Sequence, residues 1–166
     1  MYQLGDQIVY GIHGVCNIID LEIRTIDRKK VEYFVLSPVS QPQTHYYVPT
    51  QNQTALAKLR PMVTKEQIEQ ILWEVSQSTP SWISDENQRK MRYRELTGCS
   101  NLSDMITMIR DLHLHRARQL ELGKKFHMSD ERFLRDSEKV LCAEFAMVLN
   151  IPVDQVQDYV VQMIRT

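Results

Sequence analysis

The chain has 166 residues, with 20 Lys and Arg against 21 Asp and Glu, so its formal net charge is −1. Hydrophobic residues make up 43% and charged residues 25%, which are ordinary values for a globular protein and exclude a disordered or collagen-like chain. A charge sum near zero also argues against a protein that coats nucleic acid, because that affinity grows with the number of phosphates neutralised.

The sequence carries no pattern typical of a membrane span or a secretion signal. Its apolar runs, such as residues 33–36 (YFVL), are far shorter than the roughly 20 residues that cross a bilayer. The first residues do not combine a basic stretch with an apolar one. Cys16, Cys99 and Cys142 are odd in number and far apart, which disfavours a disulfide framework. We therefore expect a cytoplasmic protein without membrane association.

The first third of the chain predicts β-structure. Short runs of β-branched and aromatic residues alternate with turn residues at positions 8–10, 15–19, 23–26, 31–36 and 45–48. Runs of this length and spacing are typical of a small antiparallel barrel or curled sheet. We expect about five strands and assign them to a domain at residues 1–60, with a short linking turn near residues 52–59.

The rest of the chain has helical periodicity. Thr64 and Gln67 form a capping box that opens a helix from residue 65 to about residue 75. The other cap and stop signals predict helices at about 85–97, 101–122, 129–150 and 152–165. The fold class is therefore α+β, with the β domain followed by a compact all-α domain of about five helices at residues 61–166.

No catalytic, cofactor or metal-binding template fits the sequence. Residues 11–14 (GIHG) lie between two strands without a following Lys-Ser/Thr pair, so they predict a tight turn and not a phosphate loop. His113 and His115 are two positions apart on a predicted helix and point in different directions. We expect His113 to pack on the apolar stripe and His115 to be solvated. We predict no catalytic residue, no cofactor and no metal; an enzyme whose site is assembled only in space is a third, lower-ranked hypothesis.

One segment near the middle of the chain combines an aromatic residue with concentrated positive charge. Trp82 follows Pro80 closely and precedes four basic residues at a helix start: Arg89, Lys90, Arg92 and Arg94. Basic residues outnumber acidic ones nine to five over residues 86–125, which the whole-chain sum conceals. Two interpretations remain open: a solvated helix face with a docked tryptophan, or phosphate contacts beside an apolar wedge, as in minor-groove binders.

Short motifs along the whole chain also match one known family, in the family's order. In the first part these are residues 4–10 (LGDQIVY), 13–14 (HG), 24–26 (RTI), 32–36 (EYFVL) and 47–49 (YVP). In the second part they are Trp82, 96–98 (LTG), 108–112 (MIRDL), 129–131 (SDE), Leu141 and 144–145 (EF). The sequence thereby resembles the CarD/CdnL family of bacterial transcription regulators, whose N-terminal module is shared with the transcription-repair coupling factor.

The resemblance implies a Tudor-like or SH3-like β module that binds the β subunit of bacterial RNA polymerase. In the family this module adds edge to edge to a polymerase strand, a mode open to any sheet with an unpaired edge. Residues 24–26 match the polymerase-contacting strand, which assigns that contact to Arg24 and Ile26. Tyr47 is the third implied contact. Some members carry Arg at its position, and an aromatic side chain there can pack but cannot form a charge pair.

The resemblance further implies a helical domain that contacts promoter DNA. Trp82 matches the tryptophan that wedges at the upstream edge of the melted region, and Arg89, Lys90 and Arg92 are implied backbone contacts. The segment between Trp82 and residues 96–98 is slightly longer than in familiar members, so the basic positions do not correspond one to one. Trp73 is a rival for the wedge. Its helical spacing predicts packing at a helix end, whereas Trp82 lies in a break from which it can be presented outward.

We therefore predict a monomeric, non-enzymatic transcription regulator. It binds polymerase through residues of roughly 1–50 and stabilises the open promoter complex through its helical domain, with little sequence preference because a wedge and phosphate contacts read DNA shape. An alternative keeps the polymerase tether but gives the helical domain another protein as its partner in place of DNA.

Overall fold

The computed structural model describes residues 1–98 and 101–165; Cys99 lies outside them. The chain divides into two compact units, Met1–Met62 and Val63–Thr166. Each unit has its own cluster of buried hydrophobic side chains. No helix of the described residues is long and apolar enough to cross a membrane.

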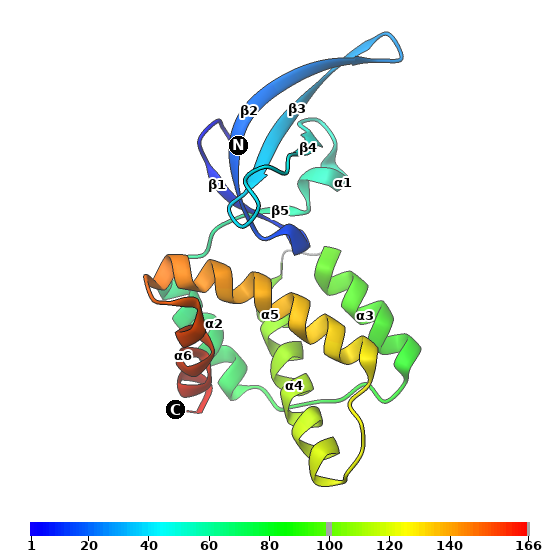
Figure 1. Ribbon diagram of the computed structural model, residues 1–166, viewed down its shortest axis with the longest axis vertical. Coiled ribbons are helices and arrows are strands. Elements are labelled where there is room, and N and C mark those ends of the chain that lie inside the picture. Colours follow the sequence, from blue (N-terminus) through cyan, green and yellow to red (C-terminus); the bar gives the residue numbers. More distant parts are fainter. Residues whose placement is uncertain (99–100, 166) are drawn as a thin grey trace. The chain divides into compact units, whose positions relative to one another are not determined.

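The first unit is built on a five-stranded antiparallel sheet with the strand order β4-β3-β2-β1-β5 (Figure 1). The strands are β1 (Gln7–Tyr10), β2 (Val15–Ile26), β3 (Lys29–Pro38), β4 (Tyr46–Pro49) and β5 (Leu59–Pro61). The short helix α1 (Gln53–Leu56) precedes β5. The sheet is open, because β4 and β5 are its two edges and do not pair in the described structure. The expected α+β class and strand number are confirmed, with an open sheet in place of a closed barrel.

Two of the five strands differ from the sequence prediction. The runs at 15–19 and 23–26 belong to one strand, β2, which carries an irregularity between Ile18 and Asp20. Asp20 and Glu22 interrupt the apolar pattern because the outer half of β2 extends beyond the core, where polar residues are tolerated. β5 begins at the last residue of the expected linking turn, where no strand was predicted. Its three residues are too few to show a period, and pairing with β1 creates the strand.

β2 and β3 form a long hairpin that extends beyond the other strands of the sheet (Figure 1). Its turn consists of Asp27 and Arg28, with φ values of 49° and 65°. Positive φ at both central residues is what a type I′ turn requires, and this turn matches the natural twist of two paired strands. From Asp20 onward the hairpin is therefore a regular ribbon to its tip, where Ile26 lies opposite Lys29.

The second unit contains five helices, as the sequence predicts (Figure 1). They are α2 (Lys65–Gln77), α3 (Glu86–Gly98), α4 (Leu102–Glu121), α5 (Met128–Leu149) and α6 (Val153–Arg165). The capping box of α2 is confirmed: the Thr64 hydroxyl accepts from the Gln67 N–H at 3.2 Å, and the Gln67 side chain accepts from the Thr64 N–H at 2.9 Å. α5 begins at Met128, one residue before the predicted start, with His127 in the N-cap position.

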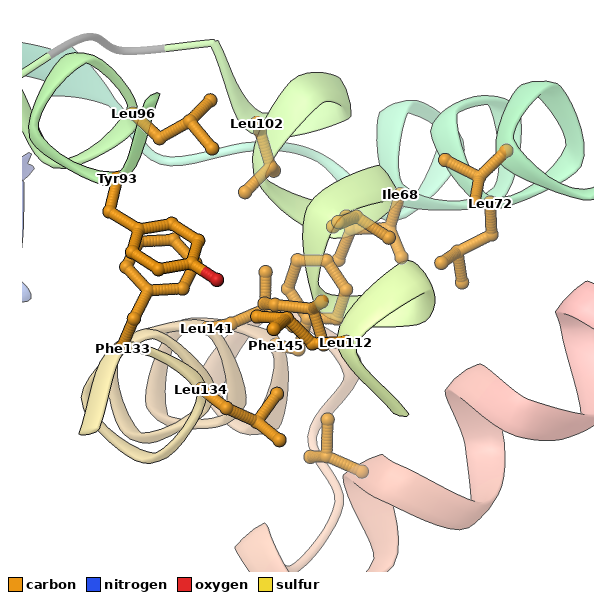
Figure 2. Close-up of a cluster of buried hydrophobic side chains, with 14 of the residues drawn as sticks. Ile68, Leu72, Tyr93, Leu96, Leu102, Leu112, Phe133, Leu134, Leu141 and Phe145 are labelled. Carbon is orange, nitrogen blue, oxygen red and sulfur yellow. The ribbon is translucent and has the colours of Figure 1, made fainter. Parts of the chain in front are cut away.

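All five helices contribute to one core in the second unit (Figure 2). Its fully buried members include Ile68, Leu72, Ile106, Leu112, Leu134 and Phe145. At one end, Tyr93 of α3 stacks on Phe133 of α5 with ring centroids 4.2 Å apart. This packing fixes the position of α3 and of the chain segment that precedes it.

Candidate functional site

The outer half of β2 has an unpaired edge. β1 pairs with β2 only at residues 15–17, whereas β3 pairs with β2 along nearly its whole length. Within the described residues, positions 20–26 therefore have a strand neighbour on one side only. A strand in this situation can accept a further strand from another chain by backbone hydrogen bonding.

Two of the three predicted polymerase contacts lie together on one face of the sheet, Arg24 on β2 and Tyr47 on β4. The Arg24 guanidinium carbon is 3.9 Å from the centroid of the Tyr47 ring, and its Nε donates to Glu22 Oε1 at 2.8 Å. Tyr47 thus supports the arginine through a cation–π contact. Ile26 is two positions after Arg24, so its side chain lies on the same face of the hairpin, farther along toward the tip.

The opposite face of the hairpin carries apolar side chains that the sequence analysis did not single out. Leu21 and Ile23 are 42% and 63% exposed and alternate with Glu22 and Arg24. Their period-two spacing is the signal that could have identified them, once residues 15–26 are treated as one strand. The hairpin therefore presents apolar surface on both of its faces.

Trp82 lies on a non-helical segment between α2 and α3 that is fixed by hydrogen bonds on both sides of the residue. The Ser81 N–H donates to Asp111 Oδ2 at 3.3 Å. Arg89 Nη1 donates to the carbonyl oxygens of Ile83 and Ser84, at 3.0 Å each. The indole is half-buried and packs against the helical core. Trp82 is therefore held in place. The sequence had instead predicted a side chain presented freely outward.

The main ring contact of Trp82 is with His115. The two ring centroids are 3.6 Å apart and the planes differ by 8°. This corrects the expectation that His115 is solvated. Asp111 and His115 lie one turn apart on α4, and the segment around Trp82 crosses this side of the helix. Helical periodicity does not reveal such a crossing, because it depends on where a distant segment runs.

His113 and Trp73 also differ from the sequence prediction. His113 is exposed at the surface of α4, where its Nε2 contacts the Glu138 carboxylate of α5. Trp73 is 57% exposed, although it was expected to pack at the end of its helix. The buried face of α2 is centred on Ile68, Leu72 and Val75. Since each helical step turns the side chain by about 100°, the residue after Leu72 points away from that face.

Arg89, a predicted DNA-backbone contact, is directed into the protein. Its side chain is only 8% exposed. Nε and Nη2 each lie 3.1 Å from an oxygen of Asp130 in a bidentate pair, and the Tyr93 hydroxyl donates to the same carboxylate at 2.7 Å. The guanidinium carbon is also 4.8 Å from the Trp82 ring centroid. Arg89 therefore positions the Trp82 segment and has no side-chain nitrogen directed at solvent for a phosphate.

The other basic residues of α3 lie at the surface, mostly beside carboxylates. Lys90 pairs with Glu86 one turn earlier. Arg92 pairs with Glu95 and with Asp104 of α4, at 3.2 Å each. Arg94 is exposed and has no acidic partner within residues 1–98 and 101–165. The cations of α3 are thus accessible but largely compensated.

A second basic stretch follows His115 directly along the chain and consists of exposed side chains: Arg116, Arg118, Lys124 and Lys125. Phe126, which ends this stretch, has its ring centroid 6.4 Å from that of His115. These residues belong to the local excess of positive charge, and Arg118 is near enough to His115 to lower the pKa of its imidazole.

The described residues contain no group of three His, Cys, Asp or Glu side chains that could hold a metal ion. Cys16 and Cys142 are free thiols. Burial raises the pKa of Cys16 to about 11 and also raises that of Cys142. Both thiols are therefore protonated near neutral pH and are poor nucleophiles.

Comparison with known proteins identifies the first unit. Residues 2–63 match the family described as the CarD-like/TRCF RID domain. This segment coincides closely with the unit Met1–Met62 and includes the hairpin with Arg24, Ile26 and Tyr47. A search of curated proteins gave no match to the chain. The N-terminal unit, an open antiparallel sheet with an unpaired strand edge, is a CarD-like/TRCF RID domain.

Proposed function

We propose that the chain is a CarD-type transcription regulator that binds the β subunit of bacterial RNA polymerase and stabilises the open promoter complex. The observation that carries this proposal is the RID-domain match over residues 2–63, in a unit with an exposed strand edge. The helical unit supplies the DNA contact. It carries a half-buried tryptophan and exposed basic side chains.

The polymerase contact uses the outer half of β2. A polymerase strand adds to the unpaired edge at positions 20–26 through backbone hydrogen bonds, and side chains on the hairpin set its specificity. Arg24 is the leading specificity residue, because the Tyr47 ring supports its guanidinium at the surface. Ile26 adds apolar contact at the tip.

Charge reversal at Arg24 tests the polymerase contact. Arg24→Glu places a carboxylate beside Glu22 and removes the cation that Tyr47 supports, so we expect binding to the isolated polymerase β lobe to weaken about tenfold or more. Surface plasmon resonance with an immobilised lobe measures this. Arg132→Glu makes the same charge change at an exposed site of the helical unit and serves as the control. Equal affinity of the Arg24→Glu variant and the control would reject the contact.

The DNA contact uses the exposed part of Trp82 with its basic neighbours. Lys90 and Arg92 can exchange their surface carboxylates for phosphates at small cost, because exposed ion pairs contribute little stability. Arg118, which acts electrostatically on His115, is a further candidate. An apolar wedge fits unwound or kinked DNA better than a regular duplex. It therefore lowers the free energy of the open state relative to the closed one.

The tether and the DNA contact act together. Binding to polymerase raises the local concentration of the helical unit at the promoter, so each DNA contact can be weak. About 3 kcal/mol of preference for the open state changes the ratio of open to closed complexes by more than a hundredfold. Little base specificity is needed, since polymerase itself selects the promoter.

Removal of the indole tests the wedge. Trp82→Ala should shorten the lifetime of the open complex by about tenfold, while affinity for the polymerase β lobe stays unchanged. The measurement is the decay of competitor-resistant complexes on a linear promoter. Trp73→Ala removes the exposed tryptophan of α2 and should leave the lifetime at the wild-type value. An unchanged lifetime for Trp82→Ala would refute the wedge.

A second candidate is a polymerase-tethered adaptor whose helical unit binds another protein. The observation that favours it is a set of exposed apolar residues around the end of α4, which includes Leu114, Leu120, Leu122 and Met128. Footprinting of the polymerase–promoter complex distinguishes the two candidates. Added protection at the upstream edge of the bubble supports DNA contact. Its absence, with the protein still bound to polymerase, supports the adaptor.

A further inference from the structure

The Trp82 indole has one flat ring contact, with His115, and its centroid lies 4.8 Å from the Arg89 guanidinium carbon. Hydrogen bonds to Ser81, Ile83 and Ser84 fix the backbone around Trp82, but they do not themselves restrict rotation of its side chain. His115 restricts that rotation, because its ring lies nearly parallel to the indole at a centroid distance of 3.6 Å. At this separation and an 8° angle the faces are in van der Waals contact.

We propose that His115 is a positioning residue for Trp82: its imidazole holds the indole in the orientation from which it contacts DNA. The inference rests on the proposed DNA contact and deepens it. A side chain that is already ordered loses less conformational entropy when it binds. A planar ring at position 115 therefore makes the wedge more effective without touching DNA itself.

The charges around His115 favour a neutral ring in this stack. Burial lowers the pKa of His115, the Asp130 carboxylate opposes this shift, and the nearby Arg89 and Arg118 guanidinium groups lower the pKa further. The imidazole is therefore neutral near pH 7. Phe126, whose ring centroid is 6.4 Å from that of His115, is apolar and adds no charge. Stacking in the neutral form brings no additional cation next to Arg89.

His113 provides a matched comparison on the same helix. It lies two positions before His115, is exposed, and contacts Glu138 on a different side of α4. The two positions carry the same residue type and are close in sequence. Among the described residues, His115 stacks on an aromatic ring and His113 does not. A positioning role predicts that substitutions at these two sites differ in their effect.

The experiment measures open-complex lifetime with the full chain and polymerase holoenzyme. His115→Ala should shorten the lifetime about three- to tenfold, the range expected when one side chain has to be ordered on binding. His115→Phe keeps a planar ring and should retain a lifetime within about twofold of wild type, and His113→Ala should have no effect. Affinity for the polymerase β lobe should be the same for all variants.

A spectroscopic measurement reports the stack directly. In a Trp73→Phe background, Trp82 is the one remaining tryptophan. Protonated imidazole quenches the fluorescence of an adjacent indole. The Trp82 emission should therefore decrease as the pH is lowered, with a midpoint below the ordinary histidine pKa of 6.5. His115→Phe should remove this titration, whereas His113→Ala should retain it.

The outcomes separate this inference from the proposed function. If Trp82→Ala shortens the lifetime but His115→Ala does not, the positioning role is wrong and the DNA contact stands. If His115→Phe is as defective as His115→Ala, a planar ring at this position is not what matters, and the inference is again overturned. If Trp82→Ala has no effect, both proposals fail.

Discussion

At the scale of single residues, the buried Arg89–Asp130 pair organises the surface around Trp82. One carboxylate accepts two hydrogen bonds from Arg89 and one from Tyr93, and the remaining guanidinium nitrogen bonds the carbonyls that follow Trp82. Both charged side chains are almost fully buried. A buried charge whose partner is removed lowers the stability of the fold, so Arg89 and Asp130 each stabilise the other in its buried position.

Neutralising Asp130 should therefore destabilise the helical unit. Asp130→Asn leaves the Arg89 charge buried without its counter-ion, and we expect the free energy of unfolding to fall by about 3 kcal/mol or more. Both tryptophans lie in this unit, so selectively excited tryptophan fluorescence during urea denaturation reports its unfolding. Asp136→Asn alters an exposed carboxylate that pairs with surface arginines and should cause no measurable change. A similar small effect for Asp130→Asn would contradict the role of the pair.

At the scale of elements, local sequence signals predict helix α2 but do not predict the edge strand β5. The Thr64–Gln67 capping box and the apolar spacing of α2 act within a few residues of each other, and the helix begins where they predict. β5 has no such local signal. Its three residues become a strand because Val9 and its neighbours on β1 offer an edge to pair with.

The capping box gives a prediction for α2. Thr64→Ala removes the acceptor of the Gln67 N–H and should lower the free energy of unfolding of the helical unit by about 1 kcal/mol. Urea denaturation followed by tryptophan fluorescence measures this. Gln70→Ala, on the exposed face of the same helix, is the control and should change stability by less than the cap does. If the two variants are equally stable, the cap contributes nothing beyond helix propensity.

At the scale of the whole molecule, the distribution of charge sets the affinity for free duplex DNA that we expect. The net charge of −1 averages many surface ion pairs with a local excess of cations near Trp82. On α3, Lys90 and Arg92 lie beside carboxylates, so little uncompensated charge is available to a free duplex. In the proposed function, polymerase therefore brings the helical unit to the promoter.

Binding to free duplex DNA should accordingly be weak and only slightly salt-dependent. We expect the dependence of log Kd on log salt concentration to correspond to about two neutralised phosphates or fewer. Fluorescence anisotropy of a labelled duplex, titrated with the full chain at several salt concentrations, measures this slope. A slope equivalent to about five or more phosphates would show that the protein binds DNA without the tether.

The sequence by itself determined the α+β class, the number of helices and the similarity to an RNA polymerase-interacting module, because periodicity, caps and ordered motifs are local properties. Tertiary structure decided which side chains face inward. Arg89 pairs with Asp130, which lies 41 positions later in the chain. Trp82, which precedes α3, stacks on His115 of α4. Trp73 is left at the surface. The physical reason is that burial depends on which distant segment covers a residue, and neither its type nor its spacing records that.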